Sequence, residues 1–175
     1  MNNVIENNEV RFANGQVTRD LQGDSDPGES AREEFPAPIG KLLGLTITSR
    51  GSGRATVEFE ASERYANPMG TLHGGVLCDL ADAAMGVAYL STLAEGETGT
   101  TIELKINFLR PVWNGKLRAE GRMVRAGKVV GLVECDIFDQ RQRLVARASS
   151  TCMTLRGQLA EGRQVSWNQT NAGGM

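Results

Sequence analysis

Residues 73–94 read HGGVLCDLADAAMGVAYLSTLA, and the apolar residues in this stretch recur at helical spacing. The stretch contains no proline to interrupt a helix. It also contains no Lys, Arg, Glu or Gln, and its only acidic residues are Asp79 and Asp82. A helix with so few charges has no side suited to water. We therefore predict one long helix that is covered on all sides.

The sequence around this helix alternates between apolar and polar residues, which is the pattern of half-buried strands. One such run precedes the helix and four follow it: residues 54–61, 100–110, 117–125, 129–139 and 144–155. In the second run, alternation places the following apolar residues on one face: Ile102, Leu104, Ile106 and Phe108. Short connections make the later strands hairpin neighbours. The predicted fold is α+β, an antiparallel sheet of about five or six strands wrapped around one long helix.

The length of the chain, 175 residues, is typical of a single domain with its own core. Residues 1–36 are polar and contain few large apolar side chains, so we predict a mobile N-terminal extension. Docking of this segment on a partner subunit is the alternative. Residues 157–175 have a similar composition and are predicted to form a mobile C-terminal tail. The predicted domain spans 37–156 and begins with a short helical turn near 39–43.

Composition narrows the classes of partner. A net charge of −2 and a pI near 5.5 argue against a broad nucleic-acid surface, although a local basic patch could bind a small anion. No apolar run approaches the roughly 20 residues that span a bilayer, and the N-terminus does not resemble a secretory signal, so we expect no membrane partner and a cytoplasmic location. One histidine and three widely spaced cysteines predict buried free thiols, no metal site and no other cofactor.

The side of the helix opposite its large apolar residues carries a different set: Gly75, Cys78, Asp82, Met85, Gly86 and Tyr89. Because a chain of this size cannot easily cover a helix on all sides, we expect this side to meet a second subunit across a two-fold axis. A carboxylate there loses hydration, so Asp82 either hydrogen-bonds a neighbouring loop or takes part in chemistry. Asp79 ranks behind it, because the helix dipole already favours a carboxylate near the first turn.

The start of the helix is preceded by a loop, and residues 67–75 read NPMGTLHGG. His73, Gly74 and Gly75 open the helix with backbone N–H groups that lack partners within it. Such an end either forms a simple turn or polarises a carbonyl group, and glycine lets a ligand approach closely. Gly74 and Asp82 lie about 12 Å apart along the axis, at about 1.5 Å per residue, too far to serve one carbonyl group. Two antiparallel helices across a two-fold axis would form two shared sites.

The loop NPMGTLHGG at 67–75, followed by Asp82, resembles the signature of the PaaI-type thioesterases of the hotdog-fold superfamily. Downstream, TIELKINFLRP at 101–111 resembles the strand that follows the long helix in that family. The resemblance covers about residues 36–156. It implies a single hotdog domain that hydrolyses an acyl-CoA thioester to a carboxylic acid and CoA, as a homodimer or a dimer of dimers.

The resemblance also implies roles for the catalytic candidates. Asn67 and the Gly74 N–H would orient and polarise the thioester carbonyl, with His73 holding the loop. Asp82 of the facing subunit would activate water as a general base or attack as a nucleophile, because a thiolate leaves readily. Thr101 lies where a hydroxyl group assists the water. The sequence does not choose between the two roles of Asp82.

Coenzyme A carries phosphates, and Arg110 is the first candidate to contact them. Arg125 and Lys128 are weaker candidates, and ordinary surface charge is the alternative for all three. The backbone of Gly75 completes the substrate-binding set, because it permits close approach. Two other functions compete with hydrolysis. They are non-catalytic acyl-CoA binding and an enoyl-thioester hydratase, which would pair a catalytic histidine with an acidic residue.

Overall fold

The computed structural model describes residues 5–6, 9–11, 17–19, 32–163 and 165. Seven antiparallel strands form the main sheet: β4 (Glu33–Glu34), β5 (Thr46–Gly51), β6 (Arg54–Ala61), β7 (Thr98–Phe108), β8 (Gly115–Ala126), β9 (Val130–Asp139) and β10 (Leu144–Leu155). The helices are α1 (Pro38–Leu43) and α2 (Gly74–Leu90), with 3-10 turns at Glu63–Tyr65 and Gly157–Leu159. Three short strands, β1 (Ile5–Glu6), β2 (Glu9–Arg11) and β3 (Val17–Arg19), form a separate sheet.

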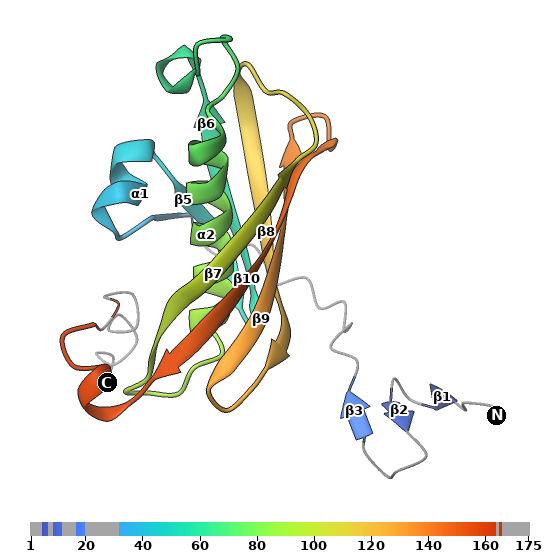
Figure 1. Cartoon of the computed structure of the whole chain (residues 1–175), viewed down its shortest axis with the longest axis vertical. Coiled ribbons are helices and arrows are strands. Elements are labelled where there is room, and N and C mark those ends of the chain that lie inside the picture. The colour runs from blue at the N-terminus through green and yellow to red at the C-terminus, as the bar shows by residue number, and fades with distance from the viewer. Residues whose placement is uncertain (1–4, 7–8, 12–16, 20–31, 164, 166–175) are drawn as a thin grey trace.

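The main sheet has the order β4-β5-β6-β8-β9-β10-β7 and curls around α2 (Figure 1). Strand β7 follows α2 in the chain but pairs with β10 at the far edge, whereas β8 pairs with β6. The helix therefore lies across one face of the sheet with β7 beside it. This arrangement confirms the predicted α+β fold and the predicted helical turn near 39–43.

The core lies between α2 and the inner face of the sheet. Alternate residues of β6 are buried there as predicted: Ala55, Val57, Phe59 and Ala61. Leu80 and Ala84 of α2 are fully buried against them, and burying a leucine side chain stabilises a fold by about 1.5–3 kcal/mol. The helix backbone approaches β8 so closely that a Cβ at Gly121 would lie 2.4 Å from the Ala84 carbonyl oxygen. Only glycine fits at this point of contact.

The predicted helix is too long at its C-terminal end, because α2 stops at Leu90 rather than Ala94. The Ser91 hydroxyl donates to the Ala88 carbonyl and the Thr92 hydroxyl to the Tyr89 carbonyl, both at 2.7 Å. These side chains satisfy carbonyls that would otherwise lack a partner at the helix end. The sheet also has seven strands rather than five or six, because the two-residue strand β4 pairs with β5 at one edge.

Residues on both sides of the predicted domain 37–156 pack against it. Phe35 is buried in the core, and Ala160 is buried after the turn at 157–159. The Thr98 hydroxyl donates to the Arg163 carbonyl at 3.0 Å. The rest of the predicted extension, apart from β1–β3 and residues 32–36, and the predicted tail beyond residue 163, apart from residue 165, lie outside the described residues, so the mobility of both segments stays a prediction.

The three cysteines are free thiols, as expected, but Cys78 of α2 is half-buried rather than buried, because it lies on the open side of the helix. Cys135 and Cys152 are buried, and burial raises the pKa of the Cys135 thiol to about 12. Such thiols are unreactive near neutral pH. Within the described part of the chain, no helix is long and apolar enough to cross a membrane.

Candidate active site

The uncovered side of α2 is narrower than the sequence predicts. Met85 and Tyr89 were expected there, but both are buried, because the curled sheet covers that part of the helix as well. The Tyr89 hydroxyl shares a 2.7 Å hydrogen bond with the Thr154 hydroxyl inside the core. The residues of this side that remain exposed or half-buried are Gly75, Cys78, Asp79, Asp82, Ala83 and Gly86. We call this set the open face of α2.

Asp82 projects from the middle of the open face and meets β7. The Thr101 hydroxyl donates a 2.9 Å hydrogen bond to Asp82 Oδ1. The second carboxylate oxygen, Oδ2, has no hydrogen-bond or ion-pair partner among residues 32–163. One oxygen is thus fixed in place while the other remains free to accept a proton or to attack. The structure brings together these two residues that the sequence had singled out.

A β-bulge in β7 is what turns Thr101 toward the helix. Glu103 pairs with Thr151 of β10, but the next residue of β10, Cys152, pairs with Thr101, so Ile102 is an extra residue. Simple alternation had placed Ile102 on the inner face with Leu104, which is wrong: Ile102 is 55% exposed. Because a bulge shifts the alternation by one residue, Thr101 joins the inner face.

Asn67 organises the loop that leads into α2. Its side-chain Oδ1 accepts hydrogen bonds from the backbone N–H groups of Met69 at 2.9 Å and Thr71 at 3.3 Å. Its amide donates to the Thr71 hydroxyl at 2.9 Å, and its second amide hydrogen has no partner among residues 32–163. Asn67 therefore holds the loop and keeps one donor free.

The N-terminus of α2 presents one free backbone donor. His73 is the N-cap residue, and its Nδ1 accepts the Gly75 N–H at 2.9 Å, while the Val76 N–H donates to the His73 carbonyl at 3.0 Å. The Gly75 N–H is therefore engaged by the His73 side chain, whereas the sequence predicted that it would be unpaired; the close approach of a substrate to the Gly75 backbone stays a prediction. Among the described residues, the Gly74 N–H has no partner. Phe108 covers this residue so closely that a Cβ at Gly74 would lie 2.9 Å from the Phe108 ring.

The open face carries negative charge without a matching cation. No ion pair involves Asp79 or Asp82 within residues 32–163, and the pKa of Asp79 is raised by burial and by the Asp82 charge. Burial and the same two carboxylates raise the pKa of the Cys78 thiol. Like charges on one face are unfavourable, so this surface is not optimised for the stability of a single chain.

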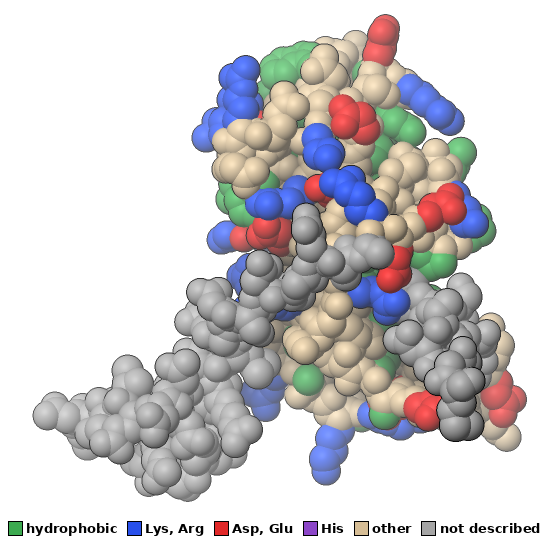
Figure 2. All heavy atoms as spheres, turned by 180° about the vertical axis from the view of Figure 1, so that it is seen from behind, with side chains coloured by type: hydrophobic (Ala, Val, Ile, Leu, Met, Phe, Trp, Pro, Cys, Tyr) green, Lys and Arg blue, Asp and Glu red, His purple; other side chains and the backbone are tan. Residues whose placement is uncertain are grey.

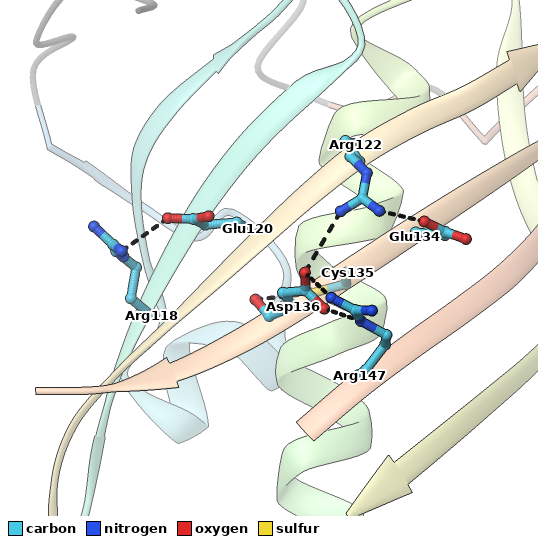
Figure 3. A network of polar contacts seen from close by, with 7 residues as sticks. All are labelled: Arg118, Glu120, Arg122, Glu134, Cys135, Asp136 and Arg147. Carbon is cyan, nitrogen blue, oxygen red and sulfur yellow. Dashed lines mark hydrogen bonds and ion pairs between the residues drawn. The ribbon is translucent and has the colours of Figure 1, made fainter. Parts of the chain in front are cut away.

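The outer face of the sheet has the opposite character. Arg147 makes two hydrogen bonds to Asp136, at 2.5 and 2.8 Å, and Arg122 contacts both Asp136 and Glu134 (Figure 3). Figure 2 shows positive and negative side chains side by side on the surface turned away from the viewer in Figure 1. Charges on the outer face are therefore largely used within the protein.

The three phosphate candidates do not come together in one chain. Arg110 is exposed just after β7, at the sheet end where Phe108 covers Gly74. Arg125 pairs with Leu132 of β9 near the opposite end of the sheet, and Lys128 lies in the following turn, where its carbonyl accepts a hydrogen bond from Arg156. Only Arg110 lies at the α2 N-terminal end, so the structure separates it from the two weaker candidates.

Comparison with known proteins shows the family of the chain. Residues 69–146 match the family described as the thioesterase superfamily. A protein of Saccharolobus solfataricus, named for an inferred esterase activity, is 35% identical over 133 residues, which cover 75% of this chain and 94% of the relative. The acyl-coenzyme A thioesterase PaaI of Escherichia coli is 34% identical over 107 residues, covering 61% of this chain and 74% of PaaI.

A solved structure shows the same fold. The conserved protein PA5202 of Pseudomonas aeruginosa superimposes with a TM-score of 0.67 at 34% sequence identity, covering 72% of this chain and 100% of that protein. The chain therefore belongs to the thioesterase superfamily, as a hotdog-fold protein of the PaaI type.

Proposed function

We propose that this protein hydrolyses acyl-CoA thioesters to a carboxylic acid and CoA, at two active sites shared between the subunits of a homodimer. The observation that carries the proposal is the pair of unengaged groups on α2, the free Gly74 N–H and the free oxygen of Asp82. A donor that polarises a carbonyl and a carboxylate that activates water are the two parts that thioester hydrolysis requires.

The two groups cannot act on one thioester within a single chain. Helix α2 is continuous from Gly74 to Leu90, so eight residues separate Gly74 from Asp82. At about 1.5 Å per residue this is about 12 Å, several times the length of a carbonyl group. If two α2 helices lie antiparallel across a two-fold axis, Gly74 of one faces Asp82 of the other.

Strand β7 offers the surface for such a dimer. It is an edge strand, and Ile102 and Phe108 on it are 55% and 54% exposed. An edge strand with exposed backbone groups and apolar side chains can pair with a second copy of itself. A two-fold axis at this edge would set the two α2 helices antiparallel, with their open faces turned toward each other.

In this arrangement the Gly74 N–H and the free amide hydrogen of Asn67 bind the thioester carbonyl oxygen. Asp82 of the partner subunit takes a proton from water as the water oxygen bonds to the carbonyl carbon. The negative charge that develops on the carbonyl oxygen is stabilised by the two donors and by the helix dipole. The carbon–sulfur bond then breaks, and the CoA thiolate leaves and takes up the proton that Asp82 accepted from water, which restores the carboxylate. Direct attack by Asp82 would instead pass through a mixed anhydride that water hydrolyses.

His73 does not support the competing hydratase function. A hydratase needs an imidazole that exchanges protons with the substrate, whereas His73 Nδ1 accepts the Gly75 N–H and caps the helix. We therefore assign His73 the role of holding the loop.

Complementation between two inactive variants tests the shared site. Asn67→Asp keeps an oxygen that can accept the Met69 and Thr71 N–H groups but removes the amide donor, so the loop is retained. Asp82→Asn removes the activating carboxylate. After subunit exchange, a heterodimer holds one doubly damaged and one intact site, and CoA release should reappear. Release is measured with a thiol reagent across short, medium, long and aromatic acyl-CoAs. Heterodimers as inactive as their parents would contradict the shared site.

A further inference from the structure

A hollow of about 240 Å³ lies at the same end of the sheet as the α2 N-terminus. One wall is the segment 111–116, which leads into β8, and the other consists of residues from 139–143, which run from the end of β9 into the turn before β10. The predicted site residues do not line it, and sequence periodicity gave no sign of it, because its two walls are distant in the chain. The proposed catalytic residues therefore do not account for this hollow.

The lining of this hollow is basic. Lys116, Arg141 and Arg143 line it together with a single acidic residue, Asp139. The Asp139 carboxylate is already engaged: Arg143 binds its Oδ2, the Arg141 and Arg143 backbone N–H groups bind its Oδ1, and these contacts lower its pKa. Lys116 pairs with Glu58 at 3.1 Å. Within residues 32–163, Arg141 has no ion-pair partner, so it is available to an anion.

An exposed tryptophan lies in the same lining. Trp113 is 58% exposed, although large aromatic side chains usually bury most of their surface. Asn114 and Gln140 also line the hollow, and their side-chain amides can both donate and accept hydrogen bonds. A planar ring that is free to stack, amide groups and an unpaired guanidinium together suit a nucleotide.

The hollow is connected to the loop of the proposed active site. The Leu72 N–H, two residues before Gly74, donates to the carbonyl of Val112, a lining residue, at 2.6 Å. Arg110 directly precedes the lining residue Pro111 and is exposed without an ion-pair partner in the described part of the chain. A long ligand can therefore have its anionic end in the hollow and its reacting end near Gly74.

The geometry points to this hollow as the site for the 3′-phosphorylated adenine nucleotide of CoA, with Trp113 stacking on the base and Arg141 binding phosphate. This inference rests on the proposed function and adds a named subsite to it. Arg110, between the hollow and Gly74, contacts the phosphates nearer the pantetheine arm. The subsite anchors the substrate and takes no part in bond breaking.

Tryptophan fluorescence tests the inference without turnover. The chain has two tryptophans, Trp113 and Trp167, so a full-length Trp167→Phe variant reports on Trp113 alone. We expect CoA and adenosine 3′,5′-bisphosphate to change this emission saturably, and pantetheine, which lacks the nucleotide, to leave it unchanged. Emission that responds to protein concentration but to neither nucleotide ligand would identify Trp113 as a subunit contact and overturn the inference.

Matched variants locate the subsite. Trp113→Ala and Arg141→Ala should each raise the Kd for CoA roughly tenfold, measured by calorimetry, since a stacked base and a charge-assisted hydrogen bond contribute on this scale. Trp113→Phe keeps a stacking ring and should lie between wild type and Trp113→Ala. Arg54→Ala is the control, because Arg54 is exposed, lies outside the hollow and has no ion-pair partner in the described chain. It should leave the Kd for CoA unchanged.

The outcomes separate this inference from the proposed function. For hydrolysis, Trp113→Ala and Arg141→Ala should raise KM for an acyl-CoA but leave KM for the matching acyl-pantetheine and both kcat values near wild type. If both variants hydrolyse acyl-CoA with the same KM and Kd as wild type, the inferred subsite is wrong and the proposed function still stands. CoA binding at Trp113 without hydrolysis of any acyl-CoA would support the subsite and overturn the proposed function.

Discussion

The open face of α2 and the outer face of the sheet use aspartate in opposite ways. On the outer face, Asp136 lies between Arg147 and Arg122, and its side chain is only 12% exposed. On the open face, Asp79 and Asp82 are exposed and have no cation beside them in residues 32–163. A carboxylate that is paired with arginines has its charge compensated in the folded state. Two carboxylates without cations repel each other. The difference supports our proposal that the open face takes part in catalysis and meets a second subunit.

Replacing Asp82 should have the largest effect on function. We expect Asp82→Asn to fold, dimerise and bind substrate but to lose about 100-fold or more in kcat, because a positioned catalytic base contributes on this scale. Steady-state CoA release measures the loss, and urea denaturation serves as the control for folding. Turnover close to wild type would remove Asp82 from the mechanism. It would also show that the open face does not use its aspartate for catalysis.

The same substitution on the outer face should give the reverse result. Asp136→Asn weakens the contacts to Arg147 and Arg122, whose side chains are 56% and 40% exposed. Solvent screening at those arginines limits the expected loss to about 1–2 kcal/mol in the free energy of unfolding. Urea denaturation measures it, and kcat should stay near wild type. A large fall in kcat without destabilisation would show that the outer face takes part in function.

Two arginines, Arg110 and Arg147, also differ in whether they have an ion-pair partner. Arg110 has no ion-pair partner in residues 32–163, whereas Arg147 is paired with Asp136. Arg110→Ala should raise KM for acyl-CoA several-fold with little change in kcat, because uniform substrate binding is lost. Added salt should raise the wild-type KM in the same direction. Arg147→Ala is the control and should leave KM unchanged. If KM for Arg110→Ala also stays unchanged and salt has no effect, the phosphates bind elsewhere.

The smallest expected effect is on the titration of Asp79. Its pKa is raised mainly by burial and secondarily by the Asp82 charge. Asp82→Asn should therefore lower the Asp79 pKa but leave it above the ordinary value. Because folding raises this pKa, the stability that Asp79 contributes is present at low pH and lost as pH rises through the folded pKa. Carbon-13 NMR titration measures the change, and an unchanged Asp79 pKa would show that the two carboxylates do not interact.

Local patterns in the sequence determined much of the architecture. The apolar spacing of residues 73–94 predicted α2, and the alternation in residues 54–61 predicted the buried side of β6, because the repeat of a helix or a strand depends on neighbouring residues alone. The helix rise also determined that Gly74 and Asp82 lie too far apart to share one carbonyl group.

Only the tertiary structure decided how the site is completed. The bulge at Ile102 turns Thr101 toward Asp82, and it depends on pairing with β10, some 50 residues later in the chain. The His73 side chain, not the sequence pattern, decides that Gly74 rather than Gly75 keeps a free N–H. Trp113 and Arg141 line one hollow because two connections that are distant in the chain lie at the same end of the sheet. Strand register, side-chain capping and the meeting of distant turns are long-range contacts, which sequence periodicity does not encode.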